Sequence, residues 1–380
     1  MTDLAKLKRV KILFDPALDR GISADIAKNL SGVVFSHQGK YLWLGTDEFT
    51  AIERFTRLEN SPDVFGEHQR FYFKDFIDGF DENRGEVDVE GLDYSDGYLW
   101  AIGSHSSKRK KVKIEPDKFT VEGKELKKVE RQGNRYLLAR IPVNEAGELD
   151  HTSTQRGWLQ RDGSSNSLTK ALATDEYLDF AQTIDGGNLA ALPGKEFYFY
   201  LPSKENGFDI EGLAVRGNKV AIGLRGPVLR GIAILLEIEV EDGLSHALNL
   251  KPIGNGGRQY KRHFLDLNGL GIRELAWDLN HENLLVLAGP TMDLDGTHSL
   301  FRLNNPFTLE DNSLSSQKNK QLTYLGNIPH GDRQDRAEGL TLDREERSIL
   351  VVYDSPAKDR LILDNLDRTI GVYADLLQID

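Results

Sequence analysis

The chain has 380 residues, of which 39% are hydrophobic, and it contains 36 glycines and no cysteine. No stretch approaches the run of about 20 apolar residues that a membrane-spanning helix needs, and the lack of cysteine excludes disulfides, thiolate metal sites and cysteine nucleophiles. The net charge of -12 argues against nucleic acid as a partner. Residues 1–20 show no signal-peptide pattern, so we expect a cytoplasmic protein.

Five segments share one pattern: an apolar residue, a polar or acidic residue, usually a glycine, an apolar strand, a tight turn and a second apolar strand. They cover residues 30–48, 89–106, 210–227, 272–290 and 337–355. Short β-rich runs joined by His-Gln-Gly, Ser-Asp-Gly or Arg-Gly-Asn are typical of hairpins. Each segment is therefore predicted to form a β-hairpin.

Further strand-like runs follow the hairpins: TAIERFTRL and RFYFKDF, RYLLARIPV and EFYFYLP, GIAILLEIEV and HALNLKPI, and HSLFRL and QLTYLGNI. The equivalent residues Gly32 and Gly91 lie 59 positions apart, and Gly212 and Glu274 lie 62 apart. A repeated four-stranded unit of this length is typical of a β-propeller blade. We predict an all-β propeller with five motif-bearing repeats, as a single domain over residues 1–380.

The last repeat has only one long β-rich run after its hairpin, TIGVYADLLQI. The N-terminal run KRVKILFDP can supply the missing fourth strand. Strands from both ends of the chain would then close the ring and remove its open edge.

The stretch between the second and third hairpins is about twice as long as the others. Residues 104–195 contain a strongly charged segment and a segment with Leu168, Ala171, Leu172 and Leu178 at helical spacing. We interpret these segments as insertions, partly helical. A sixth, degenerate blade is the alternative.

The predicted hairpins place acidic residues at one mouth of the central channel. The first strand of each blade lines the channel, and its first residues lie beside the end of the second strand. Glu90, Glu211 and Glu338 should therefore surround this mouth, with Arg225 beside Glu211.

Carboxylates crowded at one mouth repel each other unless they are protonated, paired with arginine or bridged by a cation. One interpretation is structural: Arg225 and Arg273 form ion pairs with the glutamates, which also cap backbone amides. The other is a divalent-cation site formed by Glu90, Glu211 and Glu338, because oxygen ligands suit Ca²⁺ or Mg²⁺. No motif indicates an organic cofactor.

Two other features lie at the same predicted face. His105 is a candidate catalytic acid or base, because histidine titrates near neutral pH. The basic run after it, with Lys108, Arg109 and Lys110, is a candidate site for an anionic ligand, and a solvated loop is the alternative.

Several stretches together resemble an uncharacterised bacterial propeller family, domain of unknown function 3616. They are NGFDIEGLAV, GLRGPVLRG, GSHSSKRKK, RYLLARIP, AEGLTL and VYADLL. This resemblance implies the propeller fold and no particular reaction. The blade starts are more distantly similar to those of esterase-like phytase and gluconolactonase-type propellers. In the gluconolactonase-type enzymes a blade-start glutamate holds a divalent cation. The matching positions here are Glu90, Glu211 and Glu338.

The leading hypothesis is a channel mouth that binds a small anionic ligand with a divalent cation. A metal-dependent hydrolase acting on an ester, lactone or phosphoester would use such a site, with Arg225 as anion clamp. The competing hypothesis is a non-catalytic propeller that recruits a protein partner through its inserted segment. The sequence does not decide whether the protein is an enzyme.

Overall fold

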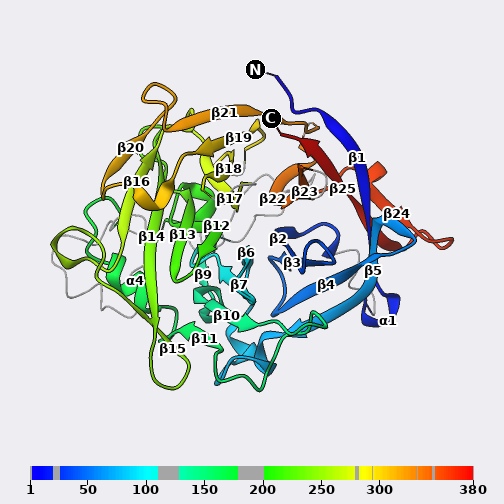
Figure 1. The fold of residues 1–380 in the computed structure, drawn as a ribbon, viewed down its shortest axis with the longest axis horizontal. Helices are drawn as coiled ribbons and strands as arrows, with labels where there is room; N and C mark the ends of the chain where they lie inside the picture. The colour runs from blue at the N-terminus through cyan, green and yellow to red at the C-terminus, as the bar shows by residue number, and fades with distance from the viewer. Residues whose placement is uncertain are drawn as a thin grey trace.

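The computed structural model describes residues 2–19, 26–109, 128–178, 201–278, 282–292, 294–331, 333–344 and 347–379. The strands wrap around a common centre, with both chain ends at the same part of the rim (Figure 1). The chain is an all-β propeller, as predicted. No helix within the described ranges is long and apolar enough to cross a membrane.

Four units contain antiparallel strands in chain order from the inside outward. The first contains β2 (Leu30–Ser36), β3 (Tyr41–Thr46), β4 (Ala51–Leu58) and β5 (Ser61–Tyr72). The second contains β6 (Val89–Ser95), β7 (Tyr98–Gly103), β10 (Leu138–Pro142) and β11 (Gly157–Leu159). The third contains β12 (Asp209–Arg216), β13 (Lys219–Gly226), β14 (Ala233–Asp242) and β16 (Lys261–Leu265). The fourth contains β17 (Gly271–Trp277), β18 (Leu284–Gly289), β19 (His298–Leu303) and β21 (Leu322–Ile328).

The last unit joins the two ends of the chain. It contains β22 (Arg336–Asp343), β23 (Ser348–Asp354), β25 (Thr369–Gln378) and β1 (Lys6–Leu13). Strand β1 pairs antiparallel with β25 and in parallel with β5 of the first unit. The predicted closure by the N-terminal strand is therefore confirmed.

Shorter elements connect these sheets. The short strands are β8 (Ser107–Arg109), β9 (Val129–Arg131), β15 (Ala247–Leu250), β20 (Ser313–Ser315) and β24 (Leu361–Leu363), and the α-helices are α1 (Pro16–Asp19) and α4 (Ser167–Leu172). The 3-10 turns are η1 (Phe73–Asp75), η2 (Glu82–Arg84), η3 (Gly133–Tyr136), η5 (Ser203–Glu205), η6 (Asn255–Gly257), η7 (Pro306–Thr308) and η8 (Lys358–Arg360).

The outer strands of the second and third units differ from the prediction. Strand β11 takes the fourth place in the second unit, where the sequence suggested EFYFYLP, most of which lies outside the described residues. In the third unit β14 bonds to both β15 and β16, and β15 continues to β11. Strand β11 has three residues and β16 has five, of which three are basic or histidine, so sequence periodicity does not reveal them.

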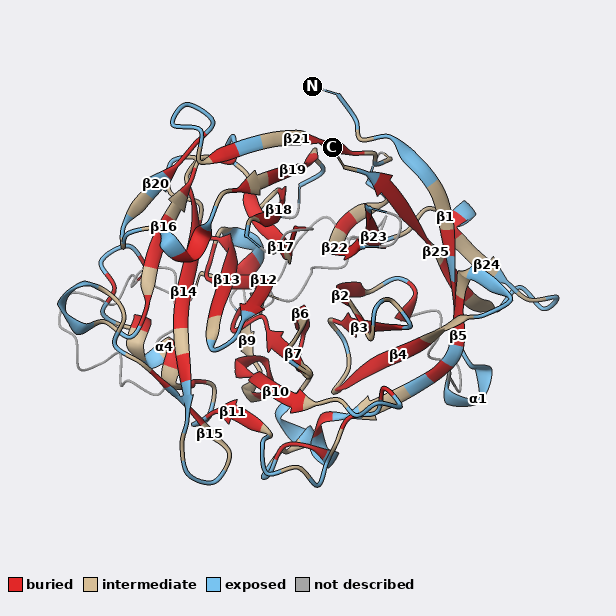
Figure 2. Cartoon of the chain, viewed as in Figure 1, coloured by how far each residue is buried: buried red, intermediate tan, exposed pale blue. Residues whose placement is uncertain are grey.

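The hydrophobic core of the described residues is divided into five clusters, each formed between two successive units. The inner strands β2, β6, β12, β17 and β22 also pack against one another in a closed cycle. Figure 2 shows the buried residues concentrated on the strands and the exposed ones on peripheral turns. Trp43 and Trp100, which occupy equivalent positions in β3 and β7, are fully buried in clusters between neighbouring units.

Helix α4 forms where the helical spacing begins, but it ends at Leu172, so Leu178 lies beyond it. The side chain of Asn166 caps it by accepting a hydrogen bond from the backbone N–H of Thr169, at 3.0 Å. Leu168 and Leu172 are fully buried against the core between the second and third units. Residues 110–127 and 179–200, which hold the rest of the insertion and the sixth-blade alternative, lie outside the described residues.

Candidate functional site

Every inner strand carries a register irregularity at its second motif position. The shifts fall between Leu30 and Val33, Val89 and Gly91, Ile210 and Gly212, Ile272 and Glu274, and Ala337 and Gly339. A β-bulge leaves one residue out of the ladder and redirects its side chain. The redirected residues are Ser31, Glu90, Glu211, Arg273 and Glu338, so the repeated acid marks a repeated bulge.

The glycine that follows the bulge allows neighbouring inner strands to approach closely. A Cβ atom on Gly91 would lie 2.6 Å from the Cβ of Leu213 in the next unit. In the fourth unit Glu274 takes the place of this glycine and is fully buried. Its Oε1 accepts hydrogen bonds from the backbone N–H groups of Leu275, at 2.9 Å, and Leu213, at 3.3 Å, and burial raises its pKa well above the ordinary value.

The redirected side chains and their neighbours form a charged group at one end of the channel, which we call the acidic mouth. It contains the carboxylates Asp47, Asp88, Glu90, Asp209, Glu211, Glu338 and Asp354 and the arginines Arg135, Arg225 and Arg273. They come from different units, yet their charges shift one another's pKa values. Carboxylates outnumber the arginines.

Two arginines hold Glu211. Nη1 of Arg225 lies 2.8 Å from Oε1 of Glu211, and Nε of Arg273 lies 2.9 Å from Oε2. Arg273 also bonds to Glu338 through Nη2. All three residues of the Glu211 group are buried. These are the ion pairs that the structural interpretation expected.

A second arginine group holds the other side of the mouth. Nη1 of Arg135 lies 2.7 Å from Oδ2 of Asp88, and its Nη2 bonds to Glu86. Burial opposes the charge of Arg135, but the carboxylates of Asp88 and Glu86 outweigh it and raise its pKa. Glu86 also accepts a bond from Lys108.

Asp47 and Glu90 have no ion pair or hydrogen bond for their carboxylates within the described part of the chain. Burial, together with the charges of Asp88, Glu338 and Asp354, raises the pKa of Asp47 to about 8. Burial and the charges of Asp88 and Glu211 raise the pKa of Glu90 well above its ordinary value. One oxygen of Asp47, Oδ1, is buried without a partner among the described residues.

The predicted basic run is partly engaged in ion pairs. Lys108 bonds to Glu86, and Arg109 bonds to Glu205 with 3.1 Å between Nη2 and Oε2. Lys110 lies outside the described residues. Lys108 and Arg109 therefore already have carboxylate partners.

His105 is buried, with both ring nitrogens bonded. Its Nδ1 donates to the carbonyl oxygen of Gly103 at 2.7 Å, and its Nε2 accepts from the side-chain amide of Asn166 at 2.6 Å. Burial lowers its pKa to about 4, so the ring is neutral at pH 7. These bonds tie helix α4 to the second unit, and the acid-base role of His105 stays a prediction.

Three residues of the acidic mouth were not among the candidates predicted from sequence: Asp88, Asp209 and Arg135. A signal for the first two is present: Asp-x-Glu-Gly-Leu occurs at residues 88–92 and again at residues 209–213. Arg135 lies in a 3-10 turn far along the chain from these motifs. Only the fold shows its contact with Asp88.

A cavity of about 820 Å³ lies at the other end of the channel, where the inner strands finish and turn into their hairpins. The acidic mouth and this cavity are thus separate features. The prediction placed ligand binding where the strands begin, and it did not anticipate the cavity.

The family model described as "Protein of unknown function (DUF3616)" matches residues 29–372. The chain belongs to this family. The family resemblance inferred from the sequence motifs is therefore confirmed. Comparison with the curated proteins finds no match.

Several solved propellers are similar in fold at low identity. The glutaminyl cyclase of Myxococcus xanthus is 10% identical, with 100% of this chain and 97% of that one covered and a TM-score of 0.41. The Cps50 (Swd1) β-propeller domain of Myceliophteria thermophila is 9% identical, with 93% and 97% covered and a TM-score of 0.36. A putative 6-phosphogluconolactonase of Bacteroides uniformis is 10% identical, with 90% and 69% covered and a TM-score of 0.33.

Proposed function

We propose that the acidic mouth binds a divalent cation and, through it, a small anionic ligand. The observation that carries the proposal is the pair of unpartnered carboxylates, Asp47 and Glu90, beside Glu338. These three side chains come from the first, second and last units. Because no described cation neutralises Asp47 or Glu90, the local charge favours a bound cation.

The donor chemistry fits Ca²⁺ or Mg²⁺, which take carboxylate oxygens as ligands. Within the described residues, no three acidic or histidine side chains are already arranged as metal ligands. Binding therefore requires Asp47, Glu90 and Glu338 to converge by side-chain rotation. Glu211 is less suited than the sequence suggested, because Arg225 and Arg273 occupy both of its oxygens.

A divalent cation at this mouth would polarise a carbonyl or phosphoryl oxygen of the anionic ligand. The carboxylates of Asp47, Glu90 and Glu338 would hold and orient the cation. Arg225 and Arg273 keep Glu211 in place, and their positive charge limits the repulsion between the remaining carboxylates. Hydrolysis of an ester, lactone or phosphoester is the class of reaction we propose to screen once cation binding is established.

Calorimetric titration with Ca²⁺ and Mg²⁺ tests the proposal. The wild type should bind one of them at pH 8.5, and Glu90→Gln should weaken binding by about tenfold or more, equivalent to about 1.4 kcal/mol. Glu310→Gln removes an exposed carboxylate outside the mouth and should change nothing. Absence of binding by the wild type, or equal binding by the wild type and Glu90→Gln, would refute the proposal.

A further inference from the structure

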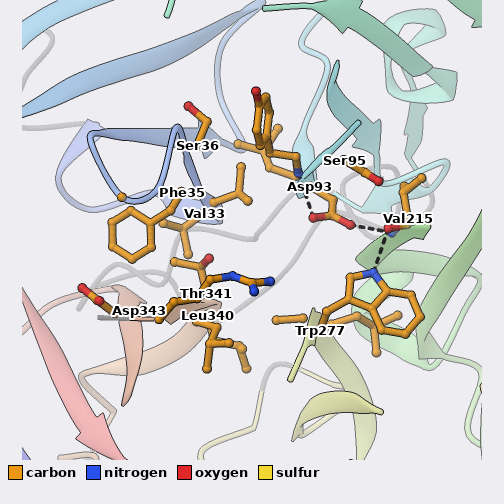
Figure 3. A pocket seen from close by; sticks show the side chains of 18 of the residues that line it. Val33, Phe35, Ser36, Asp93, Ser95, Val215, Trp277, Leu340, Thr341 and Asp343 are labelled. Atoms are coloured by element: carbon orange, nitrogen blue, oxygen red, sulfur yellow. Dashed lines mark hydrogen bonds between the residues drawn. The ribbon is translucent and has the colours of Figure 1, made fainter. Parts of the chain in front are cut away.

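The cavity at the far end of the channel is built from the closing residues of all five inner strands (Figure 3). Its volume of about 820 Å³ lies in the range of pockets that hold small organic molecules. Its lining includes residues 37–39, 94–96 and 342–344, where three of the inner strands end and their hairpin turns begin. The cavity is therefore held by the ring itself and does not depend on the inserted segment.

About half of the residues that line the cavity are apolar or aromatic, and the others are polar or charged. Leu92, Leu275 and Leu340 occupy equivalent positions in three inner strands and line it on the side of the acidic mouth. Tyr94 and Trp277 line it closer to the hairpin turns. The indole N–H of Trp277 donates to the carbonyl oxygen of Val215 at 2.8 Å, which fixes the ring in place.

Asp93 brings a carboxylate to this apolar surface. One of its oxygens accepts a hydrogen bond from the backbone N–H of Tyr94 at 2.8 Å, and the other accepts from the backbone N–H of Val215 (Figure 3). Val215 belongs to β12, so Asp93 bridges two inner strands. Both donors are neutral backbone groups, so these bonds orient the carboxylate and add no opposite charge to it.

The other charged groups of the lining are placed differently. Asp343 pairs with Arg57, with 2.8 Å between Oδ2 and Nη2. Arg216 lies over the ring of Trp277, with its guanidinium carbon 5.3 Å from the ring centroid, and its side chain is exposed. Arg344 is also exposed. Solvent screens the rim arginines more effectively than it screens the half-buried Asp93.

We infer that this cavity binds a small amphipathic amine, whose ammonium group pairs with Asp93 and whose apolar part packs against Tyr94, Trp277 and the leucine wall. An ammonium ion adds an opposite charge at the carboxylate, whose cationic neighbour Arg344 lies at the exposed rim. Aromatic faces favour the same ligand, because their quadrupoles attract cations. An anionic ligand would instead place its charge beside Asp93, and the rim arginines are too exposed to compensate.

Calorimetric titration with 2-phenylethylamine, 2-phenylethanol and phenylacetate tests the inference, because the three probes differ mainly in charge. At pH 8.5 the amine should bind about tenfold more tightly than the alcohol, and phenylacetate should bind most weakly. Ala276→Trp should abolish amine binding, because Ala276 lines the cavity and a larger side chain fills it. Glu90→Gln should leave amine binding unchanged, which separates this cavity from the acidic mouth.

Asp93→Asn should lower amine affinity about tenfold and leave alcohol binding unchanged, whereas Asp96→Asn at the exposed turn should have little effect. If Asp93→Asn does not fold, the pH dependence of the wild type replaces it. Burial raises the pKa of Asp93 to about 7, and the charge of Arg344 opposes this rise. The acidic neighbours of Asp93 are Asp96 and Glu274. The amine stays protonated at pH 6, so its affinity should fall between pH 8.5 and pH 6 as Asp93 gains a proton.

Tighter binding of phenylacetate than of the amine would overturn the inference. Amine binding that survives Ala276→Trp, or that is absent in the wild type, would also overturn it.

Discussion

Arg273 occupies the bulge position at which three other inner strands carry glutamate and one carries serine. Its guanidinium contacts Glu211 and Glu338, and it is buried. Arg273→Ala would leave two carboxylates of the mouth without this shared cation. Removing one partner of a buried ion pair costs about 3–5 kcal/mol, so we expect a loss of that size in the free energy of unfolding at pH 8, measured by urea denaturation.

The loss in the free energy of unfolding should be smaller at pH 5, because Glu211 and Glu338 can then take up protons. Arg368→Ala provides the control, since it breaks an exposed pair with Asp364 and should cost less than about 1 kcal/mol. A loss for Arg273→Ala that is the same at both pH values would show that side-chain packing, and not charge, explains the effect.

At the scale of single residues, the sequence predicts positions better than partners. The repeat identified Glu90, Glu211 and Glu338 as equivalent, and the common bulge explains why. It also predicted that Arg273, at the same position of the repeat, pairs with a glutamate, but not that it contacts both Glu211 and Glu338, because the length of a side chain and the spacing between units decide that contact. Asp93 was passed over for a similar reason: it lies within a strand, and only the ring places it at a cavity.

At the scale of elements, β1 completes the last unit and also joins it to the first. Ile12 is fully buried in the cluster between these units, whereas Leu7 on the same strand is 46% exposed. Ile12→Ala should lower the free energy of unfolding by about 2–5 kcal/mol, because it removes buried methyl groups from a packed core. Leu7→Ala should change it by less than about 1 kcal/mol.

Thermal and urea unfolding of the two variants measure this difference. If Ile12→Ala and Leu7→Ala lower the stability equally, the N-terminal strand stabilises the fold through its backbone hydrogen bonds and its buried side chains add little. Deletion of residues 1–14 would go further, because it exposes the edge of β25 to pairing with another chain, and we expect aggregation.

The element scale also shows where sequence periodicity fails. The closing role of β1 was predictable because the last repeat lacked a strand and the N-terminus offered one. The sequence did not predict strand β16 or the pairing of β15 with β11. The beginning of β14 bonds to β16, and the end of β14 bonds to β15. The local sequence pattern does not show that a long strand such as β14 pairs with different strands at its two ends.

At the scale of the whole molecule, the ring concentrates acidic groups where the five inner strands of the described residues begin, and this makes stability depend on pH. Asp47 and Asp209 each have a pKa raised from 3.8 to about 8, with burial as the largest cause. Between pH 4 and pH 8 the folded protein therefore binds more protons than the unfolded chain. The free energy of unfolding must then fall as the pH rises through this window.

We expect the melting temperature to decrease by about 1 °C or more between pH 6 and pH 8.5 in a chelating buffer, as a change of about 1 kcal/mol would produce in a chain of this length. Asp47→Asn should flatten this dependence, because the substituted side chain carries no charge at either pH, and Glu310→Gln should not. Ca²⁺ or Mg²⁺ should restore the melting temperature at pH 8.5 more than at pH 6, since protons and the cation compete for the same carboxylates. A melting temperature that stays constant across this range would mean that the arginines of the mouth already balance its charge, and the proposed cation would then lack its driving force.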